Sequence, residues 1–102
     1  MAFDGTEGGE ITLQTAVDMC AEYRRLNSGA TKAHFFGKDI LNDILDQEGC
    51  VGIRMYYGID SDDQKQLVLV GVDSDEKDMT ALVADLSKLC PTYCDTSSPL
   101  NK

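Results

Sequence analysis

Two β-rich runs joined by a short polar connection constrain the fold of this chain more than any other feature. The first run covers residues 50–58 and has the sequence CVGIRMYYG, and the second covers residues 66–73 and has the sequence QLVLVGVD. Between them lies IDSDDQK, whose aspartate and serine residues favour a turn. Strand-like runs with a short polar connection pair in antiparallel fashion. The sequence therefore predicts a β-hairpin at the centre of the fold.

The second run is apolar on both faces, because Leu67, Val68, Leu69 and Val70 follow one another without a polar residue. Successive side chains of a strand point to opposite faces, so this pattern requires cover on both sides. The run is therefore either a central strand or a strand whose second face meets another subunit. We name these four residues as the candidate interface.

Helical patterns flank the hairpin. Apolar residues recur at intervals of three and four in residues 12–26 and again in residues 37–49. The same spacing predicts a third helix within residues 78–89, which Pro91 prevents from continuing. Residues 32–36 form an edge strand or an extended connector. The predicted fold class is α+β, a hairpin-centred antiparallel sheet packed against two or three helices.

A chain of 102 residues is large enough for one core and too short for two. We divide it into a flexible N-terminal segment (1–11), a single globular α+β domain (12–89) and a C-terminal tail (90–102). The first ten residues have neither the basic nor the apolar region of a secretory signal, and no apolar run reaches about eighteen residues. We therefore expect a cytoplasmic protein that does not bind membranes.

The net charge of the chain limits the kinds of partner that it can bind. Eighteen acidic and nine basic residues give a net charge of −9, which repels phosphate backbones and anionic lipid surfaces. This small acidic protein is therefore not expected to bind nucleic acid.

The four cysteines have several readings. Without a signal peptide, Cys20, Cys50, Cys90 and Cys94 are expected to stay reduced. Cys90 and Cys94 stand in the motif CPTYC, whose spacing differs from that of common zinc knuckles and of redox pairs. Three interpretations stay open for this pair: a metal site, a local disulfide, and a chain end anchored by Cys90 and Tyr93 behind the third helix.

Arg54 is the strongest candidate for ligand binding. It stands mid-strand between Gly52 and Tyr56, so its guanidinium can meet an anionic ligand beside an aromatic ring. His34 is the only histidine in the chain and is the third candidate residue for such a site. The alternative is that Arg54 lies on an exposed sheet face and pairs with one of the many carboxylates.

Four stretches, FFGKDIL (35–41), GIRMYYGID (52–60), LVLVGVDSDEKD (67–78) and CPTYC with the closing SPLN, carry a resemblance. Together they resemble a group of small bacterial proteins of about 100 residues with no assigned function. The resemblance implies a bacterial, stand-alone domain and transfers no functional residues.

No arrangement of residues typical of catalysis is present in the sequence, and no cofactor is implied. We therefore interpret the chain as a protein-interaction or assembly module without catalytic activity, which forms a homodimer through its sheet or binds another protein. One alternative is an anionic-ligand or enzymatic site around Arg54, Tyr56 and His34. A further alternative is a metal-stabilised domain that uses Cys90 and Cys94.

Overall fold

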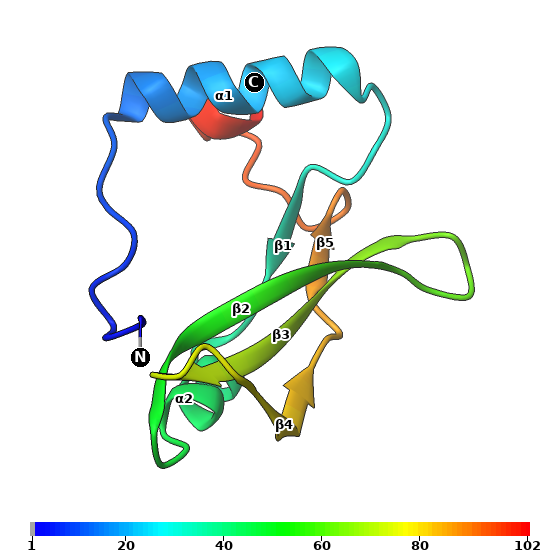
Figure 1. Cartoon of the computed structure of the whole chain (residues 1–102). Helices are drawn as coiled ribbons and strands as arrows, with labels where there is room; N and C mark the ends of the chain where they lie inside the picture. Colours follow the sequence, from blue (N-terminus) through cyan, green and yellow to red (C-terminus); the bar gives the residue numbers. More distant parts are fainter. Residues whose placement is uncertain (1) are drawn as a thin grey trace. The chain divides into compact units, whose positions relative to one another are not determined.

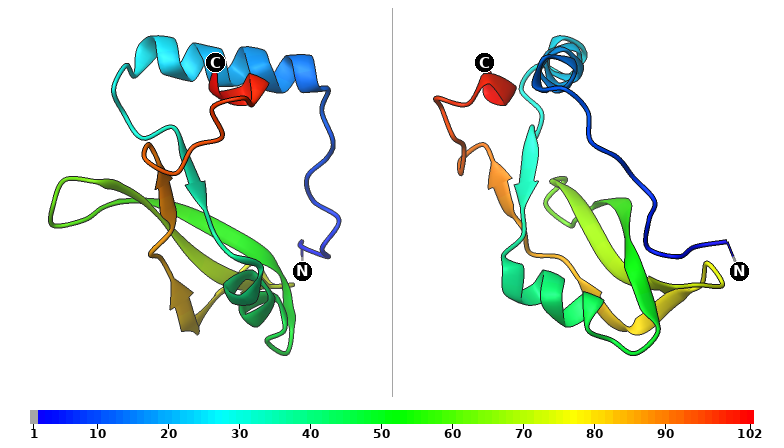
Figure 2. Two further views of the ribbon diagram at one scale, coloured as in Figure 1. Left: turned by 180° about the vertical axis from the view of Figure 1, so that it is seen from behind. Right: turned by 90° about the vertical axis from the view of Figure 1, so that its left-hand side faces the viewer.

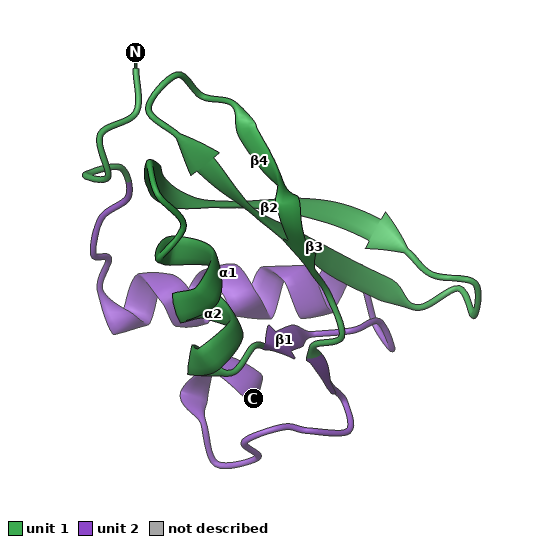
Figure 3. Cartoon of the chain, turned by 90° about the horizontal axis from the view of Figure 1, so that it is seen from below, with its two compact units in different colours: residues 1–7, 36–87 green, residues 8–35, 88–102 purple. Residues whose placement is uncertain are grey.

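The computed structural model describes residues 2–102 and divides into two compact units. Unit 1 contains residues 36–87 together with the described N-terminal residues up to Glu7, and unit 2 contains residues 8–35 and 88–102 (Figure 3). The predicted division placed residues 12–89 in one domain, whereas the structure divides the chain along other lines. Of the predicted N-terminal segment, residues 2–7 belong to unit 1 and residues 8–11 belong to unit 2. The C-terminal tail belongs to unit 2 together with the first helix.

The elements are, in chain order (Figure 1), α1 (Leu13–Leu26), β1 (Ala33–Phe35), α2 (Lys38–Leu45), β2 (Cys50–Ile59), β3 (Lys65–Asp73), β4 (Asp78–Ala84), β5 (Lys88–Cys90) and the 3-10 helix η1 (Pro99–Asn101). Strands β2, β3 and β4 form one antiparallel sheet, and β1 pairs with β5 in another. The chain is thus α+β, with helices and an antiparallel sheet. No helix among the described residues has the length and apolar character needed to cross a bilayer.

Unit 1 is built on the predicted hairpin, which Figure 2 shows as a long twisted pair of strands. β3 is the central strand of the order β2-β3-β4. It carries Leu69, which is fully buried with Ile44 of α2 and Ala84 of β4. Helix α2 packs on this face because Ile40, Leu41 and Ile44 fall on one side of it. Leu69 on one face of β3 and Val70 and Val72 on the other are almost unexposed, so this strand is covered on both faces as its sequence predicts.

The predicted third helix is wrong, because residues 78–84 form strand β4. Ala84 lies opposite Leu69 and Val83 opposite Val70 in the pairing with β3. Short apolar runs fit helical and strand periods alike, and pairing with an available strand decides between them. Leu86 has a φ of 66°, a left-handed conformation that ends any regular element at that point.

Unit 2 contains α1, the short β1–β5 pair and the C-terminal turn. Thr12 caps α1 by accepting a hydrogen bond from the Thr15 N–H to its side chain. Helix α1 lies beside η1 (Figures 1 and 2). The Arg24 guanidinium of α1 donates hydrogen bonds to the main-chain oxygens of Leu100, at 2.6 Å, and of Lys102. No residue of α1 is buried, although the helix has the predicted amphipathic pattern.

Candidate functional site

The polar centre of unit 1 is the group Arg54, Tyr56 and Asp78. Arg54 and Tyr56 lie two residues apart on one face of β2, and Asp78 begins β4 across the sheet. The Arg54 Nη1 lies 2.6 Å from one Asp78 carboxylate oxygen, and the Tyr56 hydroxyl donates to the other at 2.5 Å. The Tyr56 hydroxyl, followed by the Arg54 guanidinium, holds the pKa of Asp78 below its ordinary value.

This geometry favours the alternative interpretation of Arg54, in which a carboxylate of the same chain pairs with it. The guanidinium also lies over the Phe3 ring, 5.7 Å from its centroid, so one of its faces meets an aromatic side chain. An anionic ligand would have to displace Asp78 from this position. Asp78 stands at the start of the predicted third helix (78–89), and the pairing of β4 with β3 brings it to Arg54 instead.

His34 does not join this group within unit 1, because it lies in β1 and belongs to unit 2. It is half-buried and takes part in an interaction within the chain. The three residues of the predicted ligand site are therefore divided between the two units. Arg54 and Tyr56 share a bonded partner, Asp78.

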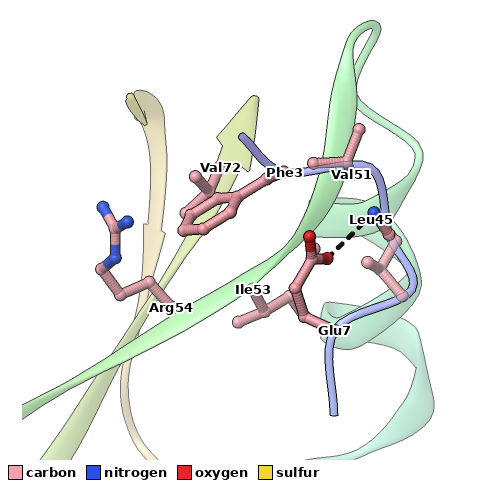
Figure 4. A pocket seen from close by; sticks show the side chains of 9 residues that line it. Phe3, Glu7, Leu45, Val51, Ile53, Arg54 and Val72 are labelled. Atoms are coloured by element: carbon pink, nitrogen blue, oxygen red, sulfur yellow. Dashed lines mark hydrogen bonds between the residues drawn. The ribbon is translucent and has the colours of Figure 1, made fainter. Parts of the chain in front are cut away.

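A cleft of about 510 Å³ adjoins Arg54 in unit 1 (Figure 4). The N-terminal segment forms one wall with Phe3 and Glu7, and the start of β2 forms another. Its apolar lining consists of Phe3, Leu45, Val51, Ile53 and Val72. Tyr56 and His34 are not part of this lining. No sequence pattern predicted the cleft, because it depends on the return of residues 2–7 to the sheet, where the Phe3 N–H donates to the Ser74 carbonyl oxygen at 3.3 Å.

The predicted interface on β3 is largely inside the fold. Leu69 is 0% exposed and Val70 is 3% exposed, while Leu67 and Val68 are half-buried. Buried side chains cannot contact a partner unless the fold opens. The β3 residues are therefore unsuitable as an interface, and a different surface has to be considered. The exposed apolar side chains of the hairpin lie instead on β2, where Met55, Tyr57 and Ile59 are 55%, 94% and 70% exposed. Ile53, on the same face of β2 as these three residues, packs against the core cluster of Ile44, Leu69 and Ala84.

Cys90 and Cys94 form a disulfide in unit 2, with their Cα atoms 4.9 Å apart. The expectation that all four cysteines are reduced is therefore wrong for this pair. Cys20 and Cys50 are free cysteines, as expected. Cys90 is the last residue of strand β5, so no helix precedes the pair directly. Cys90 is buried, but Tyr93 is exposed, so the anchor consists of Cys90 without the tyrosine.

The disulfide also bears on the metal alternative. Sulfur atoms joined to each other are not thiolate ligands, and metal binding by this pair would first require their reduction. In the part of the chain that the structure describes, no group of three or more His, Cys, Asp or Glu side chains is placed to hold a metal ion.

Comparison with known proteins adds no identity to this geometry, and the resemblance to small bacterial proteins stays a prediction. Neither the protein families, nor the curated proteins, nor the solved structures that were compared match this chain.

Proposed function

We propose that this protein is an assembly module that self-associates through the outer edge of strand β2. The observation that carries the proposal is the exposed apolar row Met55, Tyr57 and Ile59 on an edge strand. Within residues 2–102, β2 pairs with β3 alone, so its outer edge has no strand partner. Such an edge offers backbone donors and acceptors to another strand.

The edge lacks the usual protection against pairing. Natural edge strands carry lysine, proline or inward-pointing charges that block a second strand. Arg54 is the only charged residue between Cys50 and Ile59, and Asp78 already binds it. A register shift near Cys50 and Gly52 disturbs only the start of the strand. The remaining seven residues, 53–59, are free of such devices.

The sequence of residues 53–59 is suited to pairing with a copy of itself. In an antiparallel pair centred on Tyr56, each Met55 lies opposite the partner's Tyr57, and each Ile53 lies opposite the partner's Ile59. All of these side chains share the face that carries α2, so the apolar rows of two copies become continuous. Each Arg54 meets a glycine, Gly58, instead of another cation. A two-fold contact of this kind is closed and produces a dimer.

Light scattering coupled to size-exclusion chromatography tests the proposal. We expect a mass of twice the 11.1 kDa chain at micromolar concentration. Tyr57→Lys places a charge on the shared apolar row and should raise the dimer dissociation constant about tenfold or more. Tyr93→Lys, at an exposed tyrosine of unit 2, is the matched control and should leave the dimer intact. A monomeric wild-type protein, or equal effects of the two variants, would contradict the proposal.

Cross-linking tests the register. With Cys20 and Cys50 replaced by serine, a mixture of the Met55→Cys and Tyr57→Cys proteins should form a disulfide-linked dimer under mild oxidation. Opposed Cβ atoms lie about 4.5–5.5 Å apart, whereas diagonal ones lie about 7–8 Å apart. Each variant alone should therefore cross-link less than the mixture. Equal yields from all three samples would exclude pairing centred on Tyr56.

A further inference from the structure

The cleft of unit 1 shares Ile53 and Arg54 with the proposed dimer edge, but its chemistry differs from that of the edge. Its volume of about 510 Å³ falls within the range of about 300–1,000 Å³ that small-molecule sites occupy. Figure 4 shows the Phe3 ring beside Val72 and above Ile53, with Glu7 on the other side of the opening. A ligand inside would meet mainly apolar side chains on the sheet side and one carboxylate on the N-terminal side.

The two charged residues of the lining are not equivalent. The Arg54 guanidinium has Asp78 as its counter-ion at 2.6 Å, so this pair adds no net charge to the cleft. The Glu7 carboxylate accepts hydrogen bonds from the backbone N–H groups of Asp4 at 3.1 Å and Gly5 at 3.0 Å. These donors fix its position, as the dashed line in Figure 4 shows for one of them, but they carry no positive charge.

Neither of the two salt bridges found among residues 2–102 involves Glu7. Among residues 2–102 no cation is paired with Glu7, so this part of the chain leaves one uncompensated negative charge in the cleft, in a chain whose net charge is −9. An anion entering it would meet Glu7 and would compete with Asp78 for Arg54. A cation would gain a counter-ion and lose none.

From this arrangement we propose that the cleft binds a small amphiphilic amine, with its apolar body between Phe3 and the start of β2 and its ammonium group beside Glu7. The apolar body removes the half-buried side chains of Val51 and Ile53 from water and packs against the lining residue Val72, which is already buried. An aromatic body stacks on the Phe3 ring. The ammonium forms a charge-assisted hydrogen bond with Glu7.

Two matched probes test the ligand class: 1-naphthylmethylamine, which is a cation at neutral pH, and 1-naphthylacetate, the anion of 1-naphthaleneacetic acid. They share an aromatic body and differ in charge. Titration into isotopically labelled protein is followed through backbone amide signals in NMR. The amine should bind saturably, shift the signals of Phe3, Val51 and Ile53, and bind at least about tenfold more tightly than the acetate. Absence of saturable binding by the amine, equal or tighter binding of the acetate, or shifts confined to other parts of the chain would overturn the proposal.

Two variants separate a specific carboxylate from the general acidity of the chain. Glu7→Gln keeps one oxygen, which can accept one of the two backbone hydrogen bonds, and removes the charge, so the amine should lose its advantage over the acetate. Glu10→Gln removes the same charge from an exposed residue outside the lining and should preserve that advantage. An unchanged preference in Glu7→Gln, or an equal loss in Glu10→Gln, would overturn the role of Glu7. The spectrum of each free variant verifies that it is folded.

Discussion

Different interactions stabilise the interior of each of the two units of this chain. Five of the six buried apolar residues found among residues 2–102 belong to unit 1: Ile44, Leu69, Val70, Val72 and Ala84. In unit 2 the sixth, Cys90, is half of a disulfide, and helix α1 has no buried residue. Unit 1 is thus stabilised mainly by apolar burial, and unit 2 by a covalent link, short strands and capping hydrogen bonds.

This contrast shows that an amphipathic pattern does not determine whether the apolar side of a helix is buried against the rest of the protein. Helix α1 has the stronger claim to helical structure from its length of 14 residues, against eight for α2. Yet α2 buries Ile44 completely, while Met19 and Leu26 of α1 stay more than half exposed. The period of a pattern predicts the element, but only the partner surface decides whether its apolar side is buried.

The largest expected effect comes from Ile44→Ala, which should lower the free energy of unfolding of unit 1 by roughly 3 kcal/mol. The side chain is 0% exposed and packs against Leu69 and Ala84, so the variant loses burial and leaves a cavity. Amide hydrogen exchange in β3 measures the change locally. The matched control is Leu45→Ala on the same helix, where the side chain is 45% exposed and should cost less than about 1 kcal/mol.

The same experiment tests whether the two units are energetically distinct. Amides of the β1–β5 pair should lose less protection than those of β3, because Ile44 belongs to the core of unit 1. Equal losses in both units would show that they unfold as one body, and the comparison between them would then fail.

The parts of the fold that sequence reasoning found are those encoded locally. The hairpin and the helices at α1 and α2 were predicted because each depends on residues that are close in the chain. Strand β4 was missed because its state depends on pairing with β3, which a helical period in Leu82, Val83 and Leu86 concealed. Tertiary pairing there outweighs local preference.

The candidate site was predicted less well, for the same reason. Arg54 and Tyr56 were selected from the strand pattern, and both do share a polar partner. Their partner Asp78 is more than twenty residues away in sequence, and Phe3 is more distant still. Nothing local to β2 indicates either contact, so the sequence offered pairing of Arg54 with a carboxylate as an alternative but could not identify Asp78 as that carboxylate.

The second prediction concerns unit 2 and its covalent link. Replacing both Cys90 and Cys94 by serine should lower the stability of the β1–β5 pair by about 2 kcal/mol, the value expected from loop entropy for so short a loop. The Lys32 amide, which donates to the Cys90 carbonyl oxygen at 2.6 Å, is the local probe in hydrogen exchange. Cys20→Ser, at a free cysteine of the same unit, is the control and should have a smaller effect.

A reducing agent supplies an independent comparison. It should destabilise the wild-type protein toward the level of the double serine variant and leave that variant unchanged. If the Lys32 amide of the wild-type protein exchanges at the same rate with and without reducing agent, the disulfide does not stabilise unit 2. If the amides of β3 lose as much protection as Lys32, its effect is not confined to that unit.

The smallest expected effect is the pH dependence of the stability that Asp78 contributes to unit 1. The pKa of this carboxyl is lowered from its ordinary value of 3.8 by the Tyr56 hydroxyl first and then by Arg54. A group whose pKa is lower in the folded protein stabilises it above the unfolded pKa, and this contribution is lost as the pH falls through the folded pKa. The wild-type protein should therefore be more stable than Asp78→Asn above about pH 4, and the difference should shrink in stronger acid.

Urea unfolding of both proteins at a series of pH values measures that difference. Other carboxyls with lowered pKa, such as Asp60 in the hairpin turn, titrate in both proteins and cancel in the comparison. Asp62→Asn removes the same charge from the turn and serves as the control for net charge. A difference that stays constant into strong acid would show that Asp78 acts through packing and not through its charge. A difference that disappears in acid would confirm that the ionised carboxylate joins β4 to Arg54 and Tyr56 of β2, and thereby keeps the charge of Arg54 from the cleft.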